Sequence, residues 1–151
     1  MDVELQCCTR EQSVKLESLG IMANSIFWHV YPDMRGWRVL PDGMFNKRND
    51  EIEYWPAYTP SELSKLLPSH IPNGANIVPF ELTIRKGCDG IWSVGYESAG
   101  PMSIGFQSHT PEYGADTKFG ANFAKVLTDQ LISLLETGRI TAQECNERFI
   151  S

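Results

Sequence analysis

Residues 80–106 of this chain read FELTIRKGCDGIWSVGYESAGPMSIGF. Three runs within the stretch alternate between apolar and polar or glycine positions. Their apolar members are Phe80, Leu82 and Ile84, then Trp92, Val94 and Tyr96, then Met102, Ile104 and Phe106. A period of two is typical of a strand with one face on a core, and the KGCDG and SAGP segments supply turns between the runs. The stretch therefore predicts an antiparallel meander.

Three threonines stand three residues before a Glu or Gln and mark the starts of predicted helices. The pairs are Thr9 with Gln12, Thr59 with Glu62, and Thr141 with Glu144. In such a capping box the hydroxyl accepts the amide of the third helical residue, whose side chain reaches back to the cap amide. The pattern predicts helices over about residues 10–19, about two turns from residue 60, and about residues 141–150.

The longest apolar pattern at helical spacing covers roughly residues 117–137. Its apolar members are Phe123, Val126, Leu127, Leu131, Leu134 and Leu135. These residues fall on one side of a helix, so we expect a long C-terminal helix packed across the sheet. We also expect Phe149 and Ile150 to hold the terminal helix against the body of the protein.

Residues 25–40, SIFWHVYPDMRGWRVL, are aromatic and β-branched around a turn. Gly36 can take a positive φ there, so the stretch predicts a β-hairpin. Both strand faces are apolar, because alternate positions carry Phe27, His29 and Tyr31 on one side and Ile26, Trp28 and Val30 on the other. A further short strand is expected over Ile52, Tyr54 and Trp55, ending at Pro56.

These patterns together predict an α+β fold. The chain has 151 residues, 42% of them hydrophobic, which suits a single domain with one core over residues 1–151. We expect an antiparallel sheet of four to six strands, with the long C-terminal amphipathic helix and shorter helices packed on it. The terminal helix of about residues 141–150 is appended to that domain.

Charge and composition exclude several classes of partner. The formal net charge of -6 opposes non-specific binding to nucleic acid or to anionic membranes. No stretch approaches the roughly 20 apolar residues of a membrane span, and the N-terminal residues lack a signal-peptide pattern. The four cysteines include no C-x-x-C pair, which favours a reducing compartment. We expect a soluble cytoplasmic protein.

Several phrases of the sequence resemble small uncharacterised proteins encoded by bacteriophages and by mobile elements of Bacteroidetes-type bacteria. They are VKLESLG (residues 14–20), WPAYTPSELSKLLP (55–68), IWSVGYE (91–97) and LISLLETGRI (131–140). The resemblance implies a lineage with no agreed activity, and it assigns no catalytic residue.

The sequence holds no pattern that indicates a metal ion or another cofactor. His29, His70 and His109 are far apart, and no Cys or carboxylate stands at ligand spacing from them. Cys88 is the candidate for a thiol nucleophile, since it occupies a turn near Lys86. A small cysteine- or carboxylate-dependent enzyme therefore remains an alternative, although we favour a protein that is not an enzyme.

Residues 107–120 are the longest irregular stretch and lead into the expected main helix. The free amides and dipole at a helix N-terminus attract anions. His109 and Lys118 could assist there, in binding a small anion or a partner.

Aromatic residues supply the remaining functional hypothesis. We expect a binding surface built from Trp28, Tyr31, Arg35, Trp37, Tyr54 and Trp55. Trp, Tyr and Arg dominate the energetics of protein interfaces. The sequence thus predicts a non-enzymatic accessory protein that binds another protein, with an anti-defence inhibitor as a narrower version. A structural subunit of a larger assembly is a further alternative.

Overall fold

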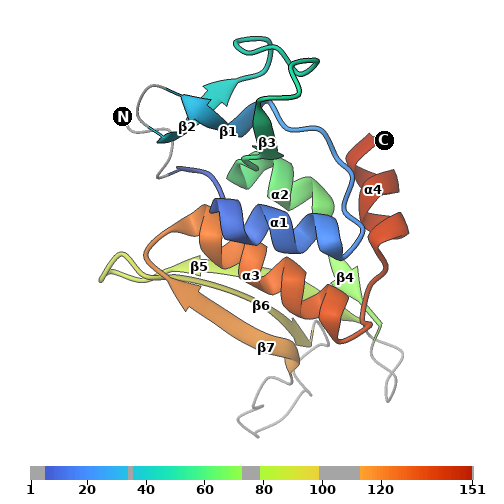
Figure 1. Cartoon of the computed structure of the whole chain (residues 1–151). Helices are drawn as coiled ribbons and strands as arrows, with labels where there is room; N and C mark the ends of the chain where they lie inside the picture. The colour runs from blue at the N-terminus through green and yellow to red at the C-terminus, as the bar shows by residue number, and fades with distance from the viewer. Residues whose placement is uncertain (1–5, 34–35, 73–78, 99–112, 151) are drawn as a thin grey trace, which may run out of the picture.

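The computed structural model describes residues 6–33, 36–72, 79–98 and 113–150. Its elements are α1 (Arg10–Ser18), β1 (Phe27–Asp33), β2 (Gly36–Pro41), β3 (Glu53–Pro56), α2 (Pro60–Leu66), β4 (His70–Ile71), β5 (Phe80–Lys86), β6 (Trp92–Ser98), β7 (Tyr113–Gly120), α3 (Phe123–Glu136) and α4 (Ala142–Ile150). Figure 1 shows α3 between the sheet that contains β5–β7 and helices α1 and α2. The predicted α+β class is confirmed. The described strands form two antiparallel sheets, however, where one was expected.

The smaller sheet contains the predicted hairpin and has the strand order β2-β1-β3. The predicted hairpin is confirmed by the antiparallel pairing of β1 with β2, and Gly36 at the start of β2 has a φ of 92°. Trp28 of β1 lies between Leu40 of β2 and Pro56 of β3. The short strand expected around Tyr54 is therefore the second neighbour of β1.

The larger sheet has the order β4-β5-β6-β7, and all its pairs are antiparallel. Its β5 and β6 are the first two strands of the predicted meander. The third expected strand, at Met102, Ile104 and Phe106, lies outside the described residues. The alternation within β5 and β6 turns Phe80, Val94 and Tyr96 toward α3, and all three are buried.

The helix expected over residues 117–137 begins later than the apolar pattern indicated. Residues 113–120 form β7, and α3 starts at Phe123 after Asn122, whose side chain accepts the Lys125 amide. Gly120 makes the tight passage from strand to helix possible. A Cβ atom there would lie 2.8 Å from Cγ2 of Val126. This close approach of β7 to α3 sets the start of the helix, and the spacing of apolar residues along the sequence does not reveal it.

Gln130 joins α3 to the sheet where the β6–β7 ladder is irregular. The register shifts between Val94 and Tyr96 of β6. With its carboxamide assigned the orientation that its neighbours require, the buried side-chain nitrogen of Gln130 donates to the carbonyls of Val94 at 3.1 Å and Asp116 at 2.8 Å. A polar side chain in the core thus satisfies main-chain groups on both strands.

All three predicted capping boxes are confirmed. The α1 and α2 boxes have both reciprocal bonds. In the α4 box, the Glu144 amide donates to Thr141 Oγ1 at 3.2 Å, and Glu144 Oε2 accepts the Thr141 amide at 3.3 Å. Each of these helices begins where the threonine pattern indicated.

Helix α4 packs on α2, although its last residue does not take the expected position. Cys145 is fully buried, and Arg148 donates to the Leu66 carbonyl at 2.9 Å. Phe149 is half-buried against the core, as expected. Ile150 is 84% exposed, so the prediction was wrong for this residue. The helix lies on the surface, and the Ile150 side chain at its end is open to solvent.

The main apolar core combines all four helices with the larger sheet. Its fully buried members include Leu16, Leu63, Leu66, Val94, Tyr96, Leu127, Leu131, Leu134 and Cys145. Trp28 and Val30 of the smaller sheet are also buried, outside that cluster. Among the described residues, no helix is long and apolar enough to span a membrane.

Candidate functional site

The connection from α1 to β1 presents exposed apolar side chains on a well-held main chain. Burial alternates along residues 21–26, with Ile21, Ala23 and Ser25 buried and Met22, Asn24 and Ile26 exposed. A period of two is that of an extended chain. In Figure 1 this connection leads from the end of α1 up to the smaller sheet. We call residues 21–26 the ridge.

Asn146 of α4 fastens the start of the ridge. Its Oδ1 accepts the Met22 amide at 2.9 Å, and its Nδ2 donates to the Gly20 carbonyl at 3.0 Å. A neighbouring strand would offer the same pairing of one acceptor and one donor. Gly20 has a φ of 99°, and a Cβ there would lie 2.9 Å from the Ala142 Cβ. The turn into the ridge is therefore pressed tightly against α4.

Tyr58 and Glu62 fasten the rest of the ridge from the core side. The Tyr58 hydroxyl donates to the Ala23 carbonyl at 2.6 Å. Glu62 of α2 accepts the Ser25 hydroxyl at 2.9 Å and the Ile26 amide at 3.1 Å, through different oxygens. Glu62 is 7% exposed, so these bonds form in a low-dielectric setting that strengthens them. The ridge is thus held in one conformation.

A hollow lies on each side of the ridge. The first, the apolar groove, has a volume of about 460 Å³ and is lined by residues 22–24 together with Asn146, Phe149 and Ile150. The second, the aromatic pocket, has a volume of about 220 Å³ and includes Trp28, Tyr54, Pro56 and Glu17. Residues 22–24 line both, so the ridge separates the two hollows. Side chains of a partner could enter either one.

The apolar side chains on this surface are unusually open to solvent. Met22 is 81%, Ile26 is 59% and Ile150 is 84% exposed. Met22 and Ile150 line the same groove. Single exposed apolar residues are ordinary, but a cluster beside concave apolar surface is typical of an interaction site.

The aromatic residues predicted to form one surface belong to two faces of the smaller sheet. Trp28 and Tyr54 share one face, where their rings meet edge-on with centroids 5.5 Å apart. Trp28 is only 5% exposed. Phe45 packs against both rings, and Lys47 lies 4.0 Å above the Trp28 ring. Trp28 is therefore mainly a core residue that forms the floor of the aromatic pocket.

The opposite face carries the other three aromatic residues of the predicted surface. Tyr31 and Trp37 are in ring contact, with centroids 5.1 Å apart, and the Arg10 guanidinium lies 4.1 Å above Trp37. The Trp55 indole donates to Glu53 at 2.9 Å. Only Tyr31 is well exposed, at 43%. The chain's own charged side chains cover much of this face, and Arg35 lies outside the described residues.

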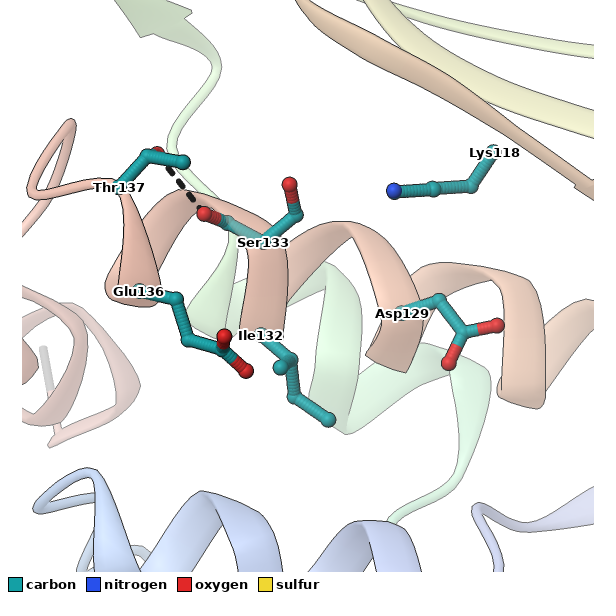
Figure 2. A pocket seen from close by; sticks show the side chains of 6 residues that line it. All are labelled: Lys118, Asp129, Ile132, Ser133, Glu136 and Thr137. Carbon is teal, nitrogen blue, oxygen red and sulfur yellow. Dashed lines mark hydrogen bonds between the residues drawn. The ribbon is translucent and has the colours of Figure 1, made fainter.

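Lys118 does not stand at the N-terminus of α3, where an anion site was expected. Figure 2 shows it on β7 beside the middle of the helix, above an open crevice of about 350 Å³ that includes Asp129, Ser133 and Glu136. The cause is β7 itself, which runs alongside α3 and does not simply lead into it. His109 lies outside the described residues, so the structure does not bring this pair together.

The two carboxylates of this crevice are held by α1. Gln12 donates to Asp129 at 2.8 Å, and Lys15 lies 3.5 Å from Glu136. These contacts clamp α1 to α3. Helix packing thus accounts for the carboxylates of Asp129 and Glu136 in this crevice. Lys118 is turned inward on β7, an edge strand of the described sheet, and such a lysine opposes unwanted pairing with another strand.

The cysteines differ sharply in environment. Cys88 is exposed in the β5–β6 turn, while Lys86 extends toward Trp92, 5.2 Å from its ring centroid. Burial, assisted by the Glu62 carboxylate, raises the pKa of Cys7 to about 11. Burial raises the pKa of Cys8 to about 12. Neither buried thiol is suited to act as a nucleophile near neutral pH.

The histidines and acidic residues are dispersed. His29 is buried, and its Nε2 lies 2.9 Å from the Cys8 carbonyl oxygen. His70 stands 4.0 Å from Glu81 on the open face of the larger sheet. Within the described ranges, no three His, Cys, Asp or Glu side chains are grouped so that they could hold a metal ion.

The ridge, Asn146 and Ile150 were not predicted as parts of a binding surface. The segment IMANSI has apolar residues at positions 21, 22, 23 and 26, so neither a period of two nor a helical period stands out. The sequence signals for an extended surface segment were limited to Gly20, which ends α1, and the polar Asn24. No protein-family model, curated protein or solved structure matches the chain.

Proposed function

We propose that this chain is a non-enzymatic binding protein that recognises another protein through the ridge and its two flanking hollows. The observation that carries the proposal is that Met22 and Ile150, both largely exposed, line the apolar groove, while Ile26 at the end of the ridge is exposed as well. Burying such side chains in a partner yields roughly 1.5–3 kcal/mol each.

The way the ridge is held supports this function. Asn146, Tyr58 and Glu62 fix its main chain before any partner arrives. A surface already in its binding conformation loses little conformational entropy on association. The aromatic pocket retains Trp28 and Tyr54 of the surface expected from the sequence, but the centre of recognition moves from the hairpin to the ridge.

The narrower proposal is an accessory protein of a phage or mobile element that acts in the bacterial cytoplasm. As an anti-defence inhibitor, it would occupy a host nuclease or signalling protein and block it sterically. Its support is the resemblance of sequence phrases such as WPAYTPSELSKLLP and the four free cysteines, which suit a reducing compartment.

Substitution of the ridge tests the proposed function. Tagged wild-type protein, Met22→Asp and Phe119→Asp are used to capture proteins from bacterial lysates, followed by quantitative mass spectrometry. Phe119 is the matched control, because it is 67% exposed on the larger sheet. We expect a stoichiometric partner with the wild type and with Phe119→Asp, and its loss with folded Met22→Asp. Equal capture by all three variants would refute recognition through the ridge.

A further inference from the structure

We propose that the ridge binds its partner by strand addition, taking an extended peptide segment that carries an apolar side chain for the groove and a basic side chain for Glu17. This inference rests on the proposed function and specifies the chemistry of the partner at that same surface. Three observations support it: the main chain at Asn24, the shape of the apolar groove and the charge of the aromatic pocket.

The main chain of Asn24 is available for pairing. In an extended chain, the main-chain groups of residues 22, 24 and 26 point to the same edge. The Met22 amide is bound to Asn146, and the Ile26 amide and carbonyl are bound to Glu62 and Asp42. Between them, the Asn24 amide and carbonyl make no hydrogen bond to any described residue. A peptide residue opposite Asn24 would supply both missing partners.

The apolar groove provides the specificity that strand addition requires. Peptides that add to a strand bind through main-chain hydrogen bonds, while pockets accept their alternate side chains. The groove of about 460 Å³ borders Asn24 and Asn146, and Phe149 and Ile150 supply apolar wall. It has room for an aliphatic side chain such as that of Val, Ile or Leu.

The aromatic pocket on the other side of the ridge favours a cation. Glu17 lines it together with Trp28 and Tyr54. No cationic side chain of the described residues lies within ion-pair distance of Glu17. A Lys or Arg of the peptide would meet the Glu17 carboxylate there, beside the aromatic side chains, one of which, Trp28, already carries Lys47 over its ring. This charge complementarity favours an apolar and basic peptide over a second copy of this acidic chain.

Two capped heptapeptides serve as probes, one alternating valine with lysine and one alternating valine with glutamate. Binding is followed by NMR titration, and protection of the Asn24 amide by hydrogen exchange. We expect the lysine peptide to bind and to slow exchange at Asn24, and the glutamate peptide to bind about tenfold more weakly or not at all. Glu17→Lys is expected to reverse this preference.

Substitution of Asn24 isolates the main-chain contribution. Asn24→Pro removes the amide donor and keeps an extended φ, whereas Asn24→Ala keeps the donor as the matched control. We expect about tenfold weaker binding of the lysine peptide by Asn24→Pro and unchanged binding by Asn24→Ala. Exchange in the wild-type protein provides the same test should the proline variant not fold.

Several results would overturn strand addition: no binding of the lysine peptide, an Asn24 amide already protected in the free protein, or unchanged exchange at Asn24 in the complex. If these occur while Met22→Asp still loses a captured partner, recognition through the ridge stands and strand addition alone fails. If Met22→Asp loses nothing, the proposed function fails as well.

Discussion

At the scale of the residue, Glu62 shows how one side chain can serve two purposes. The sequence pattern identified it as the third residue of a capping box, and its Oε1 accepts the Thr59 amide at 3.1 Å. The pattern gave no sign that the same carboxylate also holds Ser25 and Ile26, because those contacts join residues 36 and 37 positions apart. Local motifs predict local bonds, and tertiary contacts complete the polar network.

The first prediction concerns this carboxylate. Glu62→Gln places an amide nitrogen against one of the donors that Glu62 now accepts, so we expect the free energy of unfolding to fall by about 2 kcal/mol. Urea unfolding measures the change. The matched control is Glu144→Gln in the exposed capping box of α4, where water can replace a lost bond and we expect less than about 1 kcal/mol. Equal losses would contradict the special role of Glu62.

The second prediction concerns the thiols. At neutral pH we expect iodoacetamide to modify Cys88 rapidly and Cys7, Cys8 and Cys145 slowly, because burial raises the pKa of each of the three buried thiols. Mass spectrometry of peptides identifies the modified positions, and urea should make all four react. Rapid modification of Cys7 in the folded protein would contradict the burial of this thiol.

The same pKa shifts imply a stability effect in alkali. The folded protein favours the protonated thiols of Cys7 and Cys8, whose pKa values rise from 9.0 to about 11 and about 12. The stability that these two protonated thiols contribute to the folded state is complete below pH 9.0, and it is lost as the pH rises toward 12. We expect unfolding midpoints to fall over this range, and to fall less in a Cys7→Ser variant. If the unfolding midpoint of Cys7→Ser fell with pH as steeply as that of the wild type, the effect could not be assigned to the Cys7 thiol.

At the scale of the element, the starts of helices were easier to predict from the sequence than the ends of elements or the pairing of strands. Thr9, Thr59 and Thr141 each fixed a helix start through bonds within four residues. By contrast, β7 was not predicted, because its sequence YGADTKFG has only three apolar residues at alternate positions, Tyr113, Ala115 and Phe119, and the expected helix from about residue 117 overlapped it. Its strand conformation depends on pairing with β6 and on Gln130, and neither can be deduced from local spacing.

The third prediction tests that dependence. Gln130→Leu leaves the carbonyls of Val94 and Asp116 without their buried donor, so we expect a loss of roughly 2–3 kcal/mol in unfolding free energy. Hydrogen exchange should quicken along β7 more than along β5. Gln143→Leu on the exposed side of α4 is the control and should change little. Undisturbed β7 exchange in a folded Gln130→Leu protein would contradict the argument.

At the scale of the whole molecule, the two sheets differ in how they are supported. The larger sheet lies against α3 and contributes Phe80, Val94 and Tyr96 to the main core. The smaller sheet buries Trp28 and Val30 outside that cluster. The sequence predicted the α+β class but not this division, because the same alternation suits a strand in either sheet. A sheet with fewer buried contacts opens more readily.

The fourth prediction follows from the placement of the tryptophans. Trp28, Trp37 and Trp55 belong to the smaller sheet, and Trp92 stacks on Phe123 beside the larger one. In a Trp92→Phe variant, tryptophan fluorescence reports on the smaller sheet alone. We expect the unfolding midpoint measured by this fluorescence to lie at a lower urea concentration than the midpoint measured for the same variant by far-UV circular dichroism. Coincident transitions would mean that the two sheets unfold as one cooperative unit.

The clamp between Asn146 and the turn at Gly20 also orders events during synthesis. Residues 20–22 leave the ribosome early, but Asn146, which holds their main chain, follows more than a hundred residues later. Until α4 has emerged, Tyr58 and Glu62 can hold only residues 23–26, and the wall formed by Phe149 and Ile150 is missing. The groove beside residues 22–24 therefore takes its final shape late in synthesis, only after the C-terminal helix has docked.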